Sequence, residues 1–198
     1  MMSAETRQIT REDILAPEVY AQERKARRAD MLPIKKLRRI EVGPHATFYF
    51  ESYETMWLQV HEMLHIEKGG EEQIADELNA YNPMIPQGAD LSATLMFEID
   101  DPIRRANVLA RLAYVEEKSF FQIGNDKVYA SPEHDVERVT EDGKTSSVHF
   151  LHYHFSPEQI AAFTDPDTQI LLGIEHENYA HLAILSAETK AELAKDFG

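Results

Sequence analysis

The sequence predicts an α+β fold, in which several hairpins of the second half form a largely antiparallel sheet packed by helices. Short turns at residues 124–126, 142–143 and 175–178 separate strand-like segments, as hairpin-connected neighbours require. Helix-like segments mostly precede these strands, which disfavours a parallel βαβ sheet. The sequence has no internal repeat and no glycine-rich phosphate-binding loop. These observations favour a single α+β domain over residues 41–198.

Residues 1–40 predict a separate N-terminal helical arm that is rich in arginine and lysine. Pro17 suits the first turn of a polar helix over residues 18–30, and Pro33 ends or kinks that helix. Because the arm has few apolar residues, we expect it to dock on the acidic surface of this chain or of a sister subunit. Eight of the 20 basic residues lie between residues 24 and 39: Arg24, Lys25, Arg27, Arg28, Lys35, Lys36, Arg38 and Arg39.

The segment 46–68 contains the most strongly patterned helix of the chain and its single tryptophan. Residues 47–50 are rich in aromatic side chains and predict a short strand. Residues 53–66 follow as a helix whose apolar side chains share one third of the helical wheel, so this face should turn toward the core. Gly69 and Gly70 end the helix, and residues 71–81 form a second one. The core-facing residues of the first helix are Tyr53, Met56, Trp57, Val60, Met63 and Leu64.

Shorter elements are predicted for the rest of the chain. Residues 93–99 alternate between apolar and polar side chains and form a strand, which a helix over residues 103–114 follows. Ser156 and Ser186 are suited to cap two further helices, the second of which closes the chain. Three hairpins are predicted, over residues 119–130, 136–155 and 169–185.

Composition excludes several classes of function. The chain has no cysteine, so disulfides, thiolate metal sites and cysteine nucleophiles are excluded, and a metal would need His, Asp or Glu ligands. The formal net charge of −15 makes nucleic acid unsuitable as the main partner. No apolar run approaches the roughly 18 residues that span a bilayer, and no signal peptide is recognisable. We therefore expect no membrane association and a cytoplasmic location.

Five strings of the sequence resemble a known family over nearly the whole chain from Ile9 onward. They are VGPHATFYFESYETMW, IEKGGEEQIADELNAYNPMIPQG, ATLMFEIDDPIRRANVLARL, TEDGKTSSVHFLHYHF and GIEHENYAHLAIL. The chain is similar in these strings to an uncharacterised bacterial family, domain of unknown function 3501. The resemblance implies no assigned activity and no catalytic residues. It does imply a redox or oxidative-stress setting, because such proteins are often encoded beside rubrerythrin-like and iron–sulfur oxidoreductase proteins.

The helix predicted at residues 53–66 carries the HExxH pattern of zinc hydrolases, in His61, Glu62 and His65. Two histidines four residues apart share a helix face and can bind one metal, and the glutamate beside them can activate water. The residues around the motif fit poorly. Glu67 stands where such helices usually carry an apolar residue, and the region near Ile85 offers no acidic third ligand. Histidines at the boundary of an amphipathic helix explain the motif better.

A second histidine pattern lies on the strand predicted at 148–155. The period of two places His152 and His154 on one face, where they could bind a single divalent metal such as iron, zinc or manganese. Further ligands would come from the last hairpin, if it pairs beside this strand. Solvent-facing or hydrogen-bonded histidines are the alternative, because imidazole has many structural uses. The additional candidate ligands are His176, His181, Glu98 and Glu175.

Arg104 and Arg105, in the first turn of the predicted helix 103–114, could hold an anion together with the helix N-terminus. Pairing of these arginines with Asp100 or Asp101 is the alternative.

Three functions are compatible with the sequence. The first is binding of a metal or small ligand through the sheet histidines in a redox or stress-linked pathway. The second is a non-enzymatic accessory role, in which the chain docks on a protein partner of that pathway or on further copies of itself. The third is an HExxH-type metal-dependent hydrolase, so the chain's status as an enzyme stays open.

Overall fold

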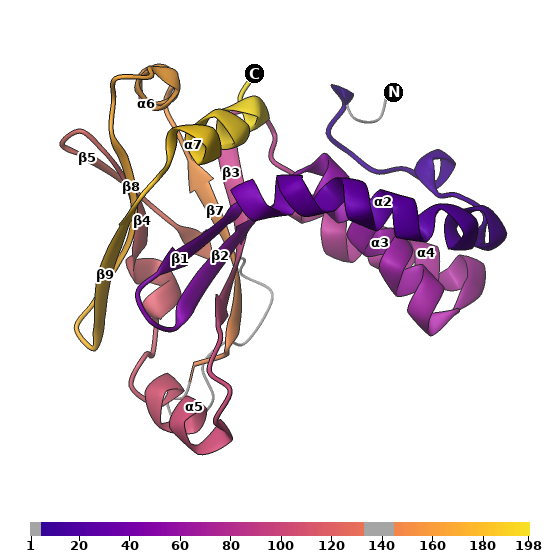
Figure 1. Cartoon of the computed structure of the whole chain (residues 1–198), viewed down its shortest axis with the longest axis horizontal. Coiled ribbons are helices and arrows are strands. Elements are labelled where there is room, and N and C mark those ends of the chain that lie inside the picture. The colour runs from indigo at the N-terminus through magenta and orange to yellow at the C-terminus, as the bar shows by residue number, and fades with distance from the viewer. Residues whose placement is uncertain (1–4, 133–144) are drawn as a thin grey trace.

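The computed structural model describes residues 5–132 and 145–198 and confirms the α+β class. Two antiparallel sheets pack face to face, and a group of helices extends to one side of them (Figure 1). The strand predicted at 136–140 lies outside the described residues.

The first sheet has five strands in the order β1-β2-β3-β7-β6. Its long central strand, β3, pairs in antiparallel register with β2 on one side and β7 on the other. The first strand, β1, falls where the sequence predicts the end of the helical arm. It forms because its residues alternate between exposed and buried and Ile40 and Val42 reach the core. The bounds are β1 (Arg39–Val42), β2 (Ala46–Phe50), β3 (Asp90–Phe97), β6 (Ser131–Pro132) and β7 (Val148–His154).

The second sheet has four strands in the order β5-β4-β8-β9 and contains two of the predicted hairpins. The last hairpin, β8–β9, pairs with β4 through β8. The predicted metal site requires this hairpin to pair beside β7. It does not, because β7 is flanked by β3 and β6 in the other sheet. The bounds are β4 (Ser119–Ile123), β5 (Asp126–Tyr129), β8 (Ile170–His176) and β9 (Tyr179–Ile184).

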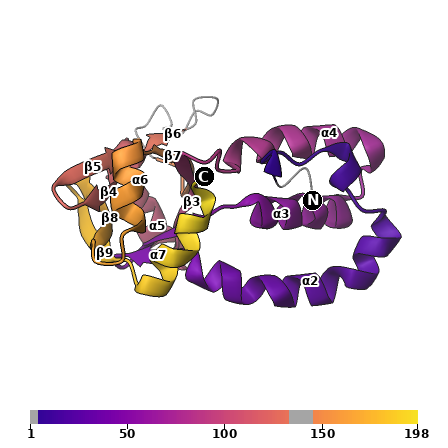
Figure 2. The ribbon, with the colours of Figure 1, turned by 90° about the horizontal axis from the view of Figure 1, so that it is seen from above.

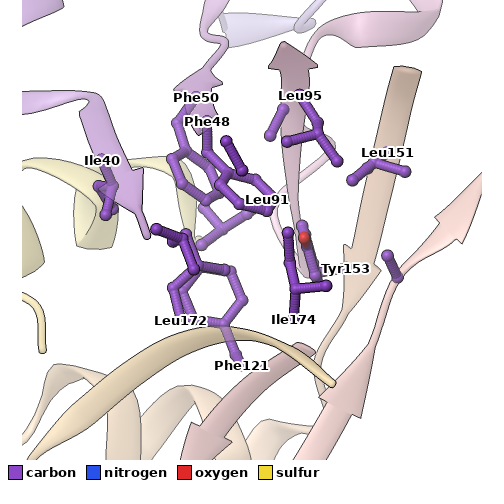
Figure 3. Packing of buried hydrophobic residues seen from close by; sticks show 14 of the residues in the cluster. Ile40, Phe48, Phe50, Leu91, Leu95, Phe121, Leu151, Tyr153, Leu172 and Ile174 are labelled. Carbon is purple, nitrogen blue, oxygen red and sulfur yellow. The ribbon is translucent and has the colours of Figure 1, made fainter. Parts of the chain in front are cut away.

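The main core fills the space between the two sheets (Figure 3). Phe48 and Phe50 of β2 point into it from the first sheet, and Phe121 and Leu172 approach from the second. Phe121 makes close ring contacts with Phe50 and with Tyr153 of β7. Because side chains alternate between the two faces of a strand, one face of each sheet lies in the core and the other faces helices or solvent.

A second, smaller core lies among the N-terminal helices, where α3 runs between α2 and α4 (Figure 2). Met56 and Val60 of α3 are buried in it, as the apolar stripe predicts. α2 is one continuous helix that includes Pro33, which differs from the predicted break. The bounds are η1 (Arg11–Asp13), α2 (Pro17–Leu37), α3 (Tyr53–Glu67), α4 (Gly70–Tyr81) and η2 (Asn82–Met84).

The other helices are short and end where the sequence offers a cap or a break. The side chains of Asp101, Ser156 and Ser186 accept the N-cap hydrogen bonds of α5, α6 and α7. α5 ends well before the predicted residue 114, and Tyr114 adopts a left-handed conformation at φ 62°. None of the helices in residues 5–132 and 145–198 combines the length and apolar character needed to cross a bilayer. The bounds are α5 (Pro102–Leu109), η3 (Val115–Lys118), α6 (Pro157–Thr164), α7 (Ala187–Leu193) and η4 (Ala194–Asp196).

Candidate functional site

A cavity of about 310 Å³ lies on the outer face of the five-stranded sheet, where the helices cover it. Its floor is built from cross-strand neighbours, because Tyr49 of β2 stands opposite Thr94 of β3, which stands opposite Phe150 of β7. Side chains that point away from the main core on three adjacent strands therefore meet on this floor. The helices supply the remaining walls, with α2, α3 and α4 all contributing.

The walls of the cavity are mainly apolar, with a few polar groups among them. Three methionines contribute flexible, polarizable side chains that adapt to irregular shapes. Gln59 and Tyr81 are the polar pair on the side of α3 and α4, with 3.5 Å between the amide nitrogen and the hydroxyl. The apolar lining includes Met56, Met84, Met96, Val148 and Phe150.

Glu51 is the acidic residue of this cavity. It follows β2 directly and precedes Ser52, the N-cap of α3, so two adjoining elements fix its backbone. Its carboxylate accepts hydrogen bonds from Thr94 at 2.9 Å and from Thr55 at 2.7 Å. Burial raises the pKa of Glu51, while the two threonine hydroxyls and the charges of Lys35 and Arg38 partly oppose that rise. A desolvated carboxylate in a cavity is a common mark of a functional site.

Arg38 lies beside this carboxylate but is bound elsewhere. It is 2% exposed and donates to the backbone carbonyls of Phe50 at 3.0 Å and Glu51 at 2.7 Å. Its guanidinium also pairs with Asp196 and, at 3.4 Å, with Glu192. Burial raises the pKa of Asp196 to about 6 in spite of the arginine beside it. Arg38 therefore ties the end of α2 to β2 and to the C-terminal helix, and leaves the Glu51 carboxylate directed at its threonine donors.

The HExxH residues brace the helices. His61 is 2% exposed, its Nδ1 lies 2.8 Å from the Trp57 carbonyl oxygen, and its Nε2 accepts the Leu15 N–H at 3.0 Å. Both ring nitrogens are thus used within the fold, and burial lowers the pKa of His61. The imidazole is buried, which corrects the expected position at the edge of the helix, because the segment before α2 covers it.

Glu62 faces α2 and is bound by it. Its carboxylate accepts hydrogen bonds from Tyr20 at 2.6 Å and from Arg24 at 2.7 and 2.8 Å. Mainly because of Arg24, the pKa of Glu62 falls to about 2. His65 contacts the Tyr20 ring, with 6.0 Å between the ring centroids. Glu62 is held by Arg24, and both ring nitrogens of His61 are already used, so these two residues do not fit the zinc-hydrolase hypothesis.

The sheet histidines do not converge. His152 and His154 share the outer face of β7, as predicted, with nearly parallel rings whose centroids are 6.3 Å apart. The His152 Nδ1 lies 3.1 Å from the Ser92 hydroxyl. His176 and His181 belong to the other sheet, where the His176 Nε2 lies 3.2 Å from the Ala113 carbonyl oxygen. The predicted set is therefore divided between two sheets.

The two acidic candidates are occupied by nearby donors. Glu98 accepts hydrogen bonds from Thr47 at 2.5 Å and Tyr49 at 2.7 Å, and Glu175 pairs with Lys127 at 2.5 Å. Within residues 5–132 and 145–198, no group of three or more His, Asp or Glu side chains is placed to hold a metal ion. The geometry thus gives the divalent-metal hypothesis no support.

The arginines at the start of α5 make local contacts. Arg105 donates to the Ile99 carbonyl at 3.2 Å, and the Arg104 guanidinium lies 3.5 Å from the His45 Nε2. The N-terminal amide of the helix is already capped, because the Asp101 carboxylate accepts the Arg104 N–H at 2.6 Å. Anion binding at this position stays a prediction.

Comparison with known proteins identifies the family of the chain. A family model described as "Protein of unknown function (DUF3501)" matches residues 8–197. The chain belongs to this family. A crystal structure from Burkholderia pseudomallei K96243, titled a novel protein of unknown function, is similar to it. That structure has 35% sequence identity and a TM-score of 0.89, and the match covers 96% of this chain and 100% of the other. No curated protein matches.

The family description names no activity. Sequence reasoning missed Glu51, although the signal was present. Phe48 and Phe50 face the core, so Thr47, Tyr49 and Glu51 have to face the opposite side of the sheet. The sequence could not indicate that helices cover that side.

Proposed function

We propose that this protein binds a small amphiphilic molecule in the cavity between the five-stranded sheet and the N-terminal helices. The observation that carries the proposal is Glu51, a carboxylate that burial desolvates and that lines a largely apolar cavity. Such a group is retained in a binding site because it orients a polar ligand, while the apolar walls supply most of the binding free energy.

The walls indicate the class of ligand. Its polar end would be a hydrogen-bond donor, an amine or a hydroxyl, because an ionised carboxylate only accepts hydrogen bonds. Its apolar body would lie against the methionines and Phe150. The volume of about 310 Å³ equals that of about ten water molecules at roughly 30 Å³ each, which suits a compact molecule.

The sequence predicts a small ligand that binds on the sheet through histidines. We keep a small ligand on the sheet, but Glu51 replaces the histidines as its polar contact. The redox-linked setting and the cytoplasmic location stay predictions.

Three probe molecules of equal length test the proposal: n-hexylamine, hexan-1-ol and hexanoate. We expect the amine and the alcohol to shift the backbone amide NMR signals of Tyr49, Thr94 and Phe150, with hexanoate binding more weakly. Glu51→Gln should weaken amine binding about tenfold, which corresponds to the roughly 1.4 kcal/mol expected when the acceptor of the ammonium group loses its charge. Val148→Trp, which fills the cavity, should abolish all three shifts.

Glu175→Gln is the matched control, because Glu175 lies on β8 of the other sheet and does not line the cavity. It should leave the shifts unchanged. The proposal is refuted if none of the probes shifts the lining residues, or if the Val148→Trp protein binds as well as the unaltered one.

A further inference from the structure

The second sheet ends at a strand whose outer edge is open. β9 is the last strand in the order β5-β4-β8-β9 and pairs with β8 through all six of its residues, Tyr179–Ile184. Within residues 5–132 and 145–198, no strand pairs with the opposite edge of β9, although β1 of the other sheet approaches β9 closely. Leu182 and Ile184 are 57% and 63% exposed, which shows that no other element covers them.

The hydrogen-bonding pattern shows which residues face the open edge. Leu185, just beyond β9, donates its N–H to the Ile170 carbonyl at 3.0 Å. Because hydrogen-bonded pairs alternate along an antiparallel ladder, Tyr179, His181 and Ala183 also bond to β8. The residues between them direct their amide and carbonyl groups away from the sheet: Ala180, Leu182 and Ile184.

These three residues also share the outer face of the sheet, because side chains two apart point the same way. The inner side of β9 is occupied by the β1–β2 turn, where the Tyr179 hydroxyl accepts from His45 and Ala46 and donates to the Val42 carbonyl. The open edge therefore presents unpaired backbone groups together with an apolar strip.

The other sheet edges within the described residues carry the features that normally block strand pairing. β1 presents Arg39 and Glu41, which pair with each other at 2.6 Å. β5 begins with Asp126 and Lys127, and β6 has only two residues, the second of which is Pro132. β9 has no charged residue, no proline and no glycine. Natural proteins rarely leave such an edge exposed.

We infer that β9 pairs with β9 of a second copy of this chain, in antiparallel register around a two-fold axis at Leu182. Ala180 of one copy then lies opposite Ile184 of the other, and about six new backbone hydrogen bonds form, two for each of three pairs. The leucines of the two copies meet on the outer face, and one continuous sheet crosses the interface.

Charge and symmetry favour a second copy over another partner. Two copies that each carry a net charge of −15 repel one another, so an interface between them has to lie where acidic side chains are absent. The edge residues of β9 are all uncharged. An antiparallel strand pair is also self-complementary, as a two-fold interface requires.

The test is sedimentation velocity of the full chain from about 5 to about 500 µM, with dimer affinities expected in the micromolar range. We expect a monomer–dimer equilibrium that tightens between about 0.1 and about 0.5 M NaCl, because salt screens the repulsion. Leu182→Glu should weaken dimerisation at least about tenfold, since it places two like charges opposite each other. Ile103→Glu, at a 72% exposed residue of α5, is the control and should not change it.

Ala180→Pro separates strand pairing from a general loss of folding. Its missing N–H faces the open edge, so the intrachain ladder should survive while the dimer is lost. Amide hydrogen exchange should show protection of Leu182 and Ile184 that rises with protein concentration. A chain that stays monomeric throughout the concentration range overturns the inference, as does a dimer that is unaffected by both Leu182→Glu and Ala180→Pro.

Discussion

Replacing Glu62 by glutamine removes one negative charge from the contact between α2 and α3. In the folded protein this carboxylate receives the Arg24 guanidinium through two hydrogen bonds and lies 3.7 Å from Arg28. Tyr20, the only buried residue of α2, donates a third hydrogen bond to it. Glutamine keeps the shape but cannot accept from the same donors as strongly.

The size of the effect follows from the pKa of Glu62, which lies at about 2 against an ordinary 4.5. Each pH unit of that difference corresponds to about 1.36 kcal/mol, so the contacts favour the ionised form by about 3 kcal/mol. The Arg24 side chain is 31% exposed, so solvent screening reduces this figure, and we expect Glu62→Gln to cost about 2 kcal/mol at pH 7. Because the folded pKa is depressed, this stability is fully present above about pH 4.5 and is lost as the pH falls toward 2.

Urea unfolding of both proteins at pH 7 and at several values below pH 4.5 measures this difference. Glu23→Gln is the control, because the Glu23–Arg27 pair is exposed on α2 and should contribute less than about 0.5 kcal/mol. A Glu62→Gln protein as stable as the unaltered chain at pH 7 would refute the bracing role. So would a deficit that persists unchanged in acid.

Three further predictions concern buried polar groups. Arg38→Met should lower the free energy of unfolding by about 3–5 kcal/mol in urea titrations, because it leaves Asp196 buried without its cation and Glu192 paired with Lys195 alone. Tyr179→Phe should cost about 2 kcal/mol by thermal or urea unfolding, since two backbone N–H groups and one carbonyl lose the hydroxyl that pairs them. The free energy of unfolding, measured from pH 4 to 8, should fall as the pH rises through the raised pKa of Glu51. Glu51→Gln should remove this part of the pH dependence. If the pH profile of the variant equals that of the unaltered protein, the Glu51 carboxylate is not desolvated.

Local patterns predicted the elements of this fold well. The hairpins 119–130 and 169–185 are confirmed because turn residues between alternating segments specify both register and direction over a few residues. The helices that begin after Ser156 and Ser186 are confirmed for the same reason, since each cap is a contact within one turn. By contrast, Pro33 sits inside a helix that tertiary contacts at both ends hold together.

Long-range placement could not be predicted from these patterns. The metal hypothesis required His181 and His152 to lie in one sheet, and strand pairing between segments far apart in the sequence leaves no local signal. The helical pattern predicts His61 at the edge of its helix. This is wrong because His61 is buried by Leu15 and Tyr20, which are distant in sequence. Glu51 was missed for the same reason, since its desolvation comes from helices that pack over the sheet.

α2 supplies one wall of the cavity beside Glu51, yet it buries a single side chain along its 21 residues. Tyr20 and Arg24 hold it near its start through Glu62, Arg27 lies over the Trp57 ring, and Arg38 holds its end, so local unfolding of this helix has to break these contacts. A molecule bound against Lys35 and Arg38 would add a further attachment. Slower amide hydrogen exchange along α2 would then report occupancy of the cavity, even at residues that the bound molecule does not touch.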